Sequence, residues 1–155
     1  MEKRLYDFLV DWTIDFVKNK DAISKKIEGI ERGKGEFDLY VKYKDKEHYF
    51  IILTKIEDVS RIIEKINPEV YFSIVTLNSK DNLDAVLKSW NSLAGFKLLS
   101  ILFINPFSES DKKWAISPHI HNKVCDESSL ERGLKSMFET VDAIEEGQLA
   151  ARLTG

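Results

Sequence analysis

Two stripes of apolar residues run along the start of the chain at helical spacing. The first stripe consists of Leu5, Phe8, Leu9, Trp12 and Phe16. The second stripe lies on nearly the opposite side and consists of Val10, Ile14 and Val17. Residues 3–19 are therefore predicted to form a helix that is buried on two faces or that contacts a partner subunit.

Further along the chain, the apolar spacing changes between that of strands and that of helices. Strands are predicted over residues 22–32, 36–43, 47–55, 70–77 and 96–104. Helices are predicted over residues 56–66, from Asn78 or Ser79 to Gly95, and from Ser129 onward, where Ser128 and Glu131 have capping-box spacing. The order α-β-β-β-α-β-α-β-α combines an antiparallel hairpin with a right-handed parallel crossover. It predicts an α/β fold with a mixed central sheet flanked by helices.

Length and charge limit the classes of protein that this chain can belong to. Its 155 residues are predicted to form a single domain over 1–155, with the core in 3–104 and a C-terminal loop and helix in 105–155. The net charge of −3 gives no overall field that attracts nucleic acid, so such a partner needs a local basic patch. One cysteine, no signal-peptide pattern and no bilayer-spanning stretch favour a cytoplasmic protein without a membrane partner.

The predicted hairpin brings two carboxylates and a lysine together. Its predicted register pairs Leu39 with Ile52, Asp38 with Leu53, and Glu36 with Lys55. Because side chains alternate between the faces of a strand, Lys55 is expected within ion-pair reach of Glu36 and Asp38 on one face. Two carboxylates can hold Mg²⁺, and a neighbouring lysine can stabilise charge on a phosphate group. The alternative is an ordinary cross-strand ion pair between Glu36 and Lys55.

The element order and these residues resemble the PD-(D/E)XK nuclease superfamily, which has the restriction-endonuclease-like fold. Its core has the order α-β-β-β-α-β, with one acid on the second strand and an acid, any residue and a lysine on the third. Asp38 is similar to the first acid and Lys55 to the lysine, but Leu53 stands at the second acid position and Phe37 at the place of a frequent proline. The resemblance covers roughly residues 3–104 and implies a magnesium-dependent nuclease that acts on DNA or RNA.

Leu53 leaves one metal ligand unassigned. Either Glu36, Glu57 or Glu64 replaces the missing acid, or the site is inactive. The candidate catalytic residues are Asp38, Lys55 and Glu36, and the candidate magnesium ligands are Asp38, Glu36 and Glu57. Because an apolar side chain cannot bind a metal ion, we favour a non-catalytic domain of this fold in a nucleic-acid-related or protein-interaction role. The alternative is an active nuclease with a migrated acid.

Three other groups of polar residues have simpler interpretations than a functional site. Asp7, Asp11 and Asp15 recur every four residues and fit a solvated helix face better than a metal site. His119, His121, Cys125 and Asp126 are ligand types that zinc accepts, but no second ligand pair follows, so a polar loop is favoured, with Cys125 structural. Basic residues at Lys18, Lys20, Lys25, Lys26, Arg32 and Lys34 alternate with acids, which favours a solvated surface over a phosphate-binding patch.

The last helix is predicted to carry one apolar stripe, with an apolar tail beyond it. The stripe consists of Leu130, Leu134, Met137, Val141 and Ile144. Leu149 and Leu153 lie off this stripe, so the tail is expected to fray or to meet another subunit. With the two-sided first helix, and because duplex-cutting nucleases of the fold it resembles are often dimers, this pattern favours a homodimer.

Overall fold

Strands and helices are distributed along the whole chain. The structure, a computed structural model, describes residues 1–124 and 126–154. The elements in chain order are α1 (Lys3–Lys20), β1 (Ile27–Arg32), β2 (Leu39–Tyr43), β3 (Glu47–Leu53), α2 (Val59–Lys65), β4 (Tyr71–Leu77), α3 (Lys80–Lys88), α4 (Trp90–Ala94), β5 (Leu99–Ile104), β6 (Lys113–Ile116), α5 (Pro118–Val124), α6 (Glu127–Glu139) and α7 (Glu146–Thr154).

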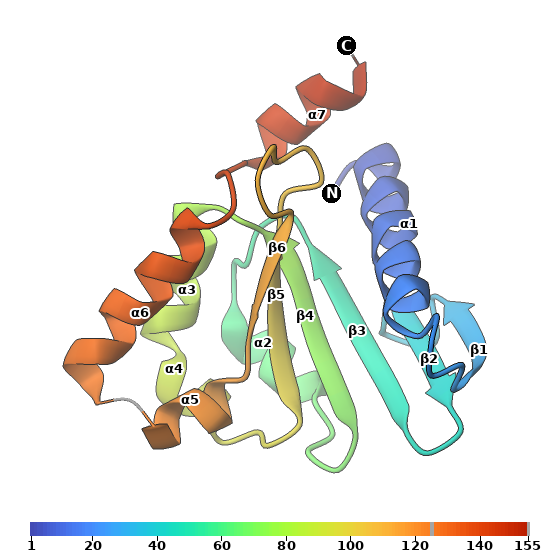
Figure 1. Ribbon diagram of the computed structural model, residues 1–155, viewed down its shortest axis with the longest axis horizontal. Helices are drawn as coiled ribbons and strands as arrows, with labels where there is room; N and C mark the ends of the chain where they lie inside the picture. The colour runs from blue at the N-terminus through green and yellow to red at the C-terminus, as the bar shows by residue number, and fades with distance from the viewer. Residues whose placement is uncertain (125, 155) are drawn as a thin grey trace.

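Within the described residues, the strands form one six-stranded mixed sheet in the order β1-β2-β3-β4-β5-β6 (Figure 1). β1, β2 and β3 pair antiparallel, β3, β4 and β5 pair parallel, and β6 pairs antiparallel with β5. The predicted α/β class, the antiparallel hairpin and the parallel crossover are therefore confirmed. The sequence prediction missed β6, because its four residues are too few to show a clear alternation.

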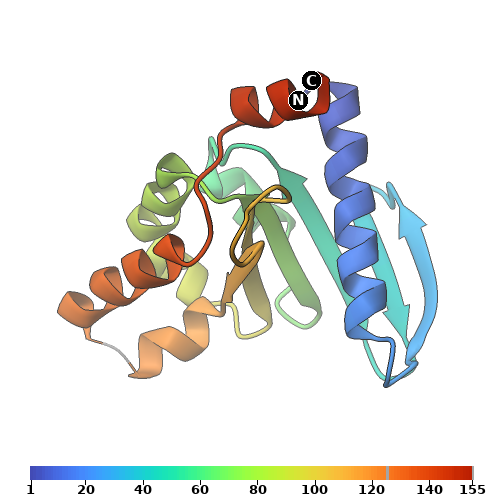
Figure 2. The same cartoon turned by 45° about the horizontal axis from the view of Figure 1, so that its top comes forward.

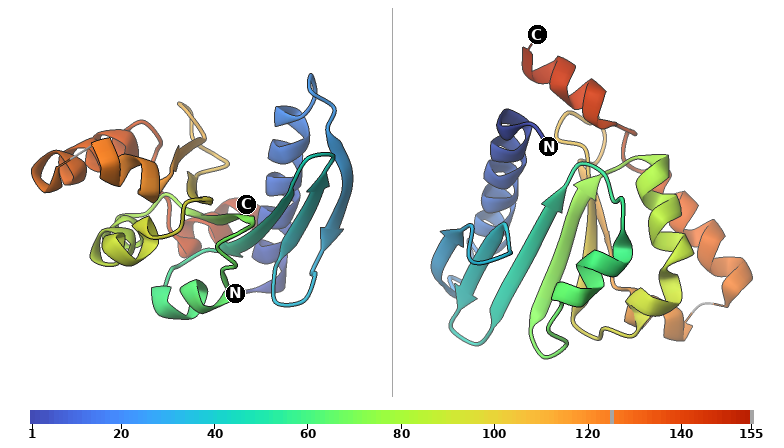
Figure 3. Two further views of the ribbon diagram at one scale, coloured as in Figure 1. Left: turned by 90° about the horizontal axis from the view of Figure 1, so that it is seen from below. Right: turned by 180° about the vertical axis from the view of Figure 1, so that it is seen from behind.

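Two apolar cores lie on opposite faces of the sheet. On one face, α1 and α7 pack against side chains that include Leu39, Phe50 and Leu102. On the other face, α2, α3, α4 and α6 pack against a core that includes Phe72 and Phe103. The views from below and from behind in Figure 3 show these helical layers on either side of the strands. Among the described residues, no helix is both long enough and apolar enough to cross a bilayer.

Both stripes of α1 have partners within the chain. The buried side of the helix consists of Leu5, Leu9, Val10, Thr13, Ile14 and Val17. On the flank, Phe8 stacks on Phe107 and Trp12 stacks on Phe16, each with ring centroids 5.7 Å apart. Figure 2 shows α7 crossing to the N-terminal end of α1, where Leu149 is fully buried. The expectation that the apolar tail frays or meets another subunit is therefore wrong, since α7 packs in the same core as α1.

The hairpin between β2 and β3 has a different register from the predicted one. Leu39 pairs with Phe50 and not with Ile52, a shift of two residues. The cause is a tighter turn, in which the backbone N–H of Tyr43 donates to the carbonyl of Lys46 at 2.9 Å. This turn brings the rings of Tyr40 and Tyr49 within 4.9 Å of each other and moves the predicted partners of Asp38 and Glu36 out of register.

The C-terminal third departs furthest from the prediction. The predicted C-terminal loop contains β6 and α5, and the single predicted terminal helix is divided into α6 and α7. The N-cap of α6 is Asp126, whose carboxylate accepts from the backbone N–H of Ser129 at 2.8 Å, so the predicted capping box at Ser128 is wrong. Ser79 is the N-cap of α3, as predicted, but the helix expected up to Gly95 is divided into α3 and α4.

Candidate functional site

Asp38 connects α1 to the sheet at the point where β2 begins. Its Oδ1 accepts a hydrogen bond from the hydroxyl of Tyr6 on α1 at 2.7 Å, and its Oδ2 accepts one from the backbone N–H of Ile52 on β3, also at 2.7 Å. Burial, followed by the hydrogen bond to Asp38 and its negative charge, raises the pKa of Tyr6, so the phenol stays protonated and donates. Both carboxylate oxygens of Asp38 therefore hold the helix and the strands together.

Lys55 and Glu36 lie in exposed positions at the ends of the hairpin strands. Among the described residues, no ion pair joins Lys55 to Asp38 or to Glu36. The predicted ion pair is therefore wrong. The ion pair does not form because β2 begins at Leu39 and β3 ends at Leu53. Glu36 and Lys55 therefore both lie outside the paired strands.

Lys55 shares a cavity with Glu57 and not with Asp38. This cavity has a volume of about 540 Å³ and lies between the loop after β3 and α3. Its other charged lining residues are Asp58, Asp81, Asp84 and Lys88. In the part of the chain that the structure describes, no three His, Cys, Asp or Glu side chains are grouped to hold a metal ion. The catalytic and metal-binding roles of Asp38, Glu36 and Glu57 stay predictions.

Leu53, which stands where the resemblance expects the second acid, packs against the apolar core. Leu53 is partly buried and packs against the core on the α2 side of the sheet, as does Phe37. The ring of Phe37 lies 4.8 Å from that of Tyr49 and 5.7 Å from that of Phe72. An acid in place of Leu53 would replace apolar contacts with a partly buried charge, which is costly without a partner.

The charged residues near the N-terminus form ion pairs with one another. Arg32 pairs with Asp11, and Lys34 pairs with Glu31 at 3.8 Å. Lys42 pairs with Glu28 at 4.0 Å. These ion pairs agree with the predicted solvated surface of mixed charge, on which acids compensate part of the positive charge.

The histidines of the C-terminal part have partners in the backbone. Nδ1 of His119 lies 2.8 Å from the carbonyl oxygen of Ala94, and Nδ1 of His121 lies 3.1 Å from the carbonyl oxygen of Ser117. His119 therefore connects α5 to the end of α4, which is a structural role. Cys125, the remaining member of the predicted zinc set besides Asp126, lies outside the described residues.

A polar row that sequence reasoning missed crosses three strands on the α1 side of the sheet. Nε2 of His48 lies 2.7 Å from Oγ of Ser73, which lies 2.6 Å from Oγ of Ser100. Ser73 and Ser100 are direct partners in the parallel pairing of β4 and β5. The row lies in a cavity of about 430 Å³, which we call the serine pocket. Its other lining residues are Phe16, Val17, Lys20, Asp21, Ser24, Lys26, Tyr43, Asp45, Lys46, Phe50, Leu102, Ala115 and Ser117.

The surroundings of His48 keep its imidazole neutral. Its ring stacks on that of Phe50 with centroids 4.3 Å apart. Burial lowers the pKa of His48 to about 3, and the positive charges of Lys46 and Lys20 act in the same direction. At neutral pH the ring therefore carries one proton, and it can either donate to Ser73 or accept from it.

This neutral histidine has a consequence for stability. Between pH 7 and pH 5.5 the unfolded chain takes up a proton at His48, whose ordinary pKa is 6.5, whereas the folded protein, with a pKa of about 3, does not. We therefore expect the free energy of unfolding to fall by about 1 kcal/mol over this interval. Urea titrations at both values measure it. His48→Gln should remove most of the fall, and an equal fall in the variant would contradict the assignment.

A sequence signal for the serine pocket does exist. Near the beginning of β4 and of β5, one serine interrupts an apolar run, Ser73 and Ser100, and His48 lies near the beginning of β3. Because β3, β4 and β5 run parallel, these positions meet at one end of the sheet. The signal is weak, since single serines are common in buried strands.

Comparison of the chain with models of known protein families, with curated proteins and with solved structures finds no match.

Proposed function

We propose that this chain is a non-catalytic domain of restriction-endonuclease-like architecture that acts by binding. The observation that carries the proposal is that both carboxylate oxygens of Asp38 accept hydrogen bonds within the fold, one from the Tyr6 hydroxyl and one from the Ile52 amide. Leu53, at the position where the resemblance expects the second acid, packs against the core. The order α1-β1-β2-β3-α2-β4 agrees with the core order of the nucleases that the sequence resembles.

Nucleic acid and a second copy of the chain are the partners that the sequence predicts for such a domain. A homodimer stays a prediction that has lost part of its basis, because α7 buries its apolar residues against the core of its own chain. A nucleic-acid partner stays a prediction too, and the ion pairs of Arg32 and Lys34 argue for a modest electrostatic contribution. A cytoplasmic location likewise stays a prediction.

The alternative function is a magnesium-dependent nuclease with a migrated acid. One observation favours it as second candidate: Lys55 and Glu57 line the same cavity. In this form Glu57 would replace the missing acid beside Lys55, and Asp38 would take no part. Such an enzyme would lose activity in Glu57→Ala and keep it in Asp38→Asn.

A hydrolysis assay tests the proposal. We expect no cleavage of supercoiled plasmid, single-stranded DNA or RNA above the buffer control with 5–10 mM Mg²⁺ or Mn²⁺, because the acids do not converge. Asp38→Asn, Glu57→Ala and Lys55→Ala, purified identically, should give the same background. Cleavage by the wild type that any one of these substitutions abolishes would overturn the proposal, and a loss in Glu57→Ala would identify Glu57 as the acid that replaces Leu53.

A further inference from the structure

We propose that the serine pocket binds a small phosphate ester, whose phosphate group is held by serine hydroxyls and by the ammonium groups of Lys20 and Lys46. The pocket lies at the amino ends of β3, β4 and β5, whereas Asp38 contacts β3 near its carboxyl end, at Ile52. The two places are distinct, so this binding site does not depend on whether the nuclease-like residues are active.

The polar row can direct hydrogen-bond donors into the pocket. When the single proton of the neutral His48 ring is on Nε2, it donates to Oγ of Ser73, and the Ser73 hydroxyl then donates to Oγ of Ser100. The hydroxyl hydrogen of Ser100 is left free to donate to a ligand. Ser117, which also lines the pocket, follows β6, the strand next to β5. Phosphate oxygens are acceptors, so a row of hydroxyl donors suits them.

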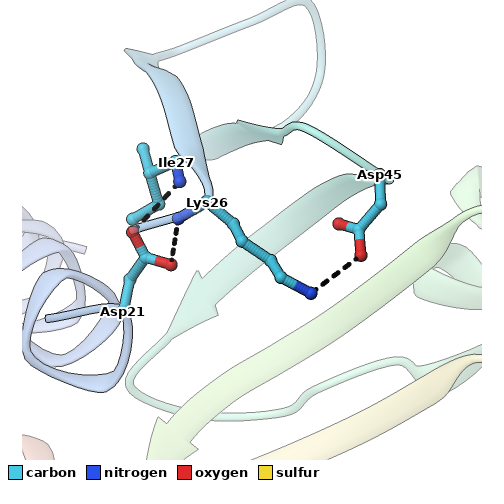
Figure 4. A network of polar contacts seen from close by, with 4 residues as sticks. All are labelled: Asp21, Lys26, Ile27 and Asp45. Carbon is cyan, nitrogen blue, oxygen red and sulfur yellow. Dashed lines mark hydrogen bonds and ion pairs between the residues drawn. The ribbon is translucent and has the colours of Figure 1, made fainter. Parts of the chain in front are cut away.

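The acids at the mouth of the pocket already have partners. Figure 4 shows that the carboxylate of Asp21 accepts from the backbone N–H groups of Lys26 and Ile27, at 2.9 and 3.0 Å. The Nζ of Lys26 pairs with Asp45 at 3.3 Å. These contacts satisfy both carboxylates and fix the loop after α1 to the turn between β2 and β3. Because Asp21 and Asp45 already have these partners, Lys20 and Lys46 can interact with a ligand.

Lys20 and Lys46 supply positive charge without a carboxylate partner among the described residues. The Nζ of Lys46 lies 4.7 Å from the ring centroid of Tyr71 and 5.0 Å from that of Tyr43, and the Nζ of Lys20 lies 6.0 Å from that of Phe16. The pocket is lined by three lysines, Lys20, Lys26 and Lys46, and by two aspartates, Asp21 and Asp45, so its lining carries one excess positive charge. A dianionic group placed there would offset this charge.

The size of the pocket indicates that the ligand is an ester and not free phosphate. Its volume of about 430 Å³ falls in the range of sites for small organic molecules and exceeds what one phosphate group fills. The side chains of Phe16, Phe50 and Leu102 give it apolar walls. These walls would contact the organic part of the ligand while the hydroxyls and lysines hold the phosphate.

Titration with phenyl phosphate, followed by ¹H–¹⁵N NMR and calorimetry, tests the proposal. Benzoate, which has the same ring and a single planar carboxylate, is the matched control at equal ionic strength. We expect saturable binding of phenyl phosphate that is at least tenfold tighter than that of benzoate, with the largest amide shifts at His48, Ser73 and Ser100. We also expect the imidazole pKa of His48 to rise on binding, because the anion offsets the two lysines. No saturable binding, or equal binding of benzoate, would overturn the proposal.

Two double lysine variants distinguish binding in the serine pocket from nonspecific attraction between the protein and the anion. Lys20→Ala with Lys46→Ala should weaken phenyl phosphate binding at least tenfold, and Ser100→Ala should weaken it several-fold. Lys65→Ala with Lys97→Ala removes the same charge from exposed positions that do not line the pocket, and should leave the affinity within twofold. Equal losses in the two double variants would show nonspecific attraction and would also overturn the proposal.

Discussion

Replacing Asp38 with alanine is expected to lower the free energy of unfolding by about 2 kcal/mol, because a part-buried hydroxyl and a backbone amide both lose their acceptor. The donors concerned are Tyr6 Oη and Ile52 N. Urea unfolding followed by far-UV circular dichroism measures the change. Tyr6→Phe, which removes one of the two donors, should cost about 1 kcal/mol.

The double variant, Tyr6→Phe combined with Asp38→Ala, tests whether the loss comes from the hydrogen bond between these two residues. If the Tyr6 hydroxyl and Asp38 stabilise the fold through their hydrogen bond, the losses of Tyr6→Phe and Asp38→Ala should be less than additive when combined. Asp15→Ala, a carboxylate on the exposed side of α1, serves as the control and should change stability by less than about 0.5 kcal/mol. A loss at Asp38 no larger than that at Asp15 would contradict the structural role of Asp38.

Leu149→Ala should destabilise the protein by about 3 kcal/mol, because this fully buried leucine of α7 fills the core between α7 and α1. The measurement is the urea midpoint at several protein concentrations. Since the core belongs to one chain, the midpoint of the wild type and of the variant should not depend on concentration.

Thr154→Ala, an exposed change on the same helix, is the control for Leu149 and should be nearly neutral. If Leu149→Ala is as mild as the control, α7 does not pack as described. If the midpoint of the wild type rises with concentration, the chain self-associates and the predicted homodimer regains its basis.

The order of the elements could be predicted because it depends on local spacing. The apolar repeat of α1 and the crossover between β4 and β5 are strong signals, and the structure confirms both. The register of the hairpin could not be predicted, because a turn shorter by two residues keeps the same side chains on the same faces. The division of the last helix was missed as well, since Val141 and Ile144 continue the spacing of Leu134 although the helix ends at Glu139.

The candidate site could be predicted only in part, because its contacts join residues that are far apart in the sequence. The sequence identifies Asp38 as a candidate site residue in a predicted strand, and in the structure both of its carboxylate oxygens accept hydrogen bonds. Its partner Tyr6 lies 32 residues earlier and belongs to a helix whose apolar stripes gave no hint of this contact. Likewise, Ser73 and Ser100 become neighbours only through the parallel pairing of β4 and β5, so their hydrogen bond has no local signal in the sequence.

Line broadening by Mn²⁺ tests most directly whether Asp38 holds the fold or a metal ion. Micromolar Mn²⁺ broadens the NMR resonances of nuclei close to a bound ion, whether or not hydrolysis occurs. We expect no selective broadening of the amides of Asp38, Leu53 and Lys55 in the wild type, because the carboxylate oxygens of Asp38 are engaged by Tyr6 and Ile52. Selective broadening of these amides that disappears in Asp38→Asn would contradict the proposed non-catalytic domain and would identify Asp38 as a metal ligand.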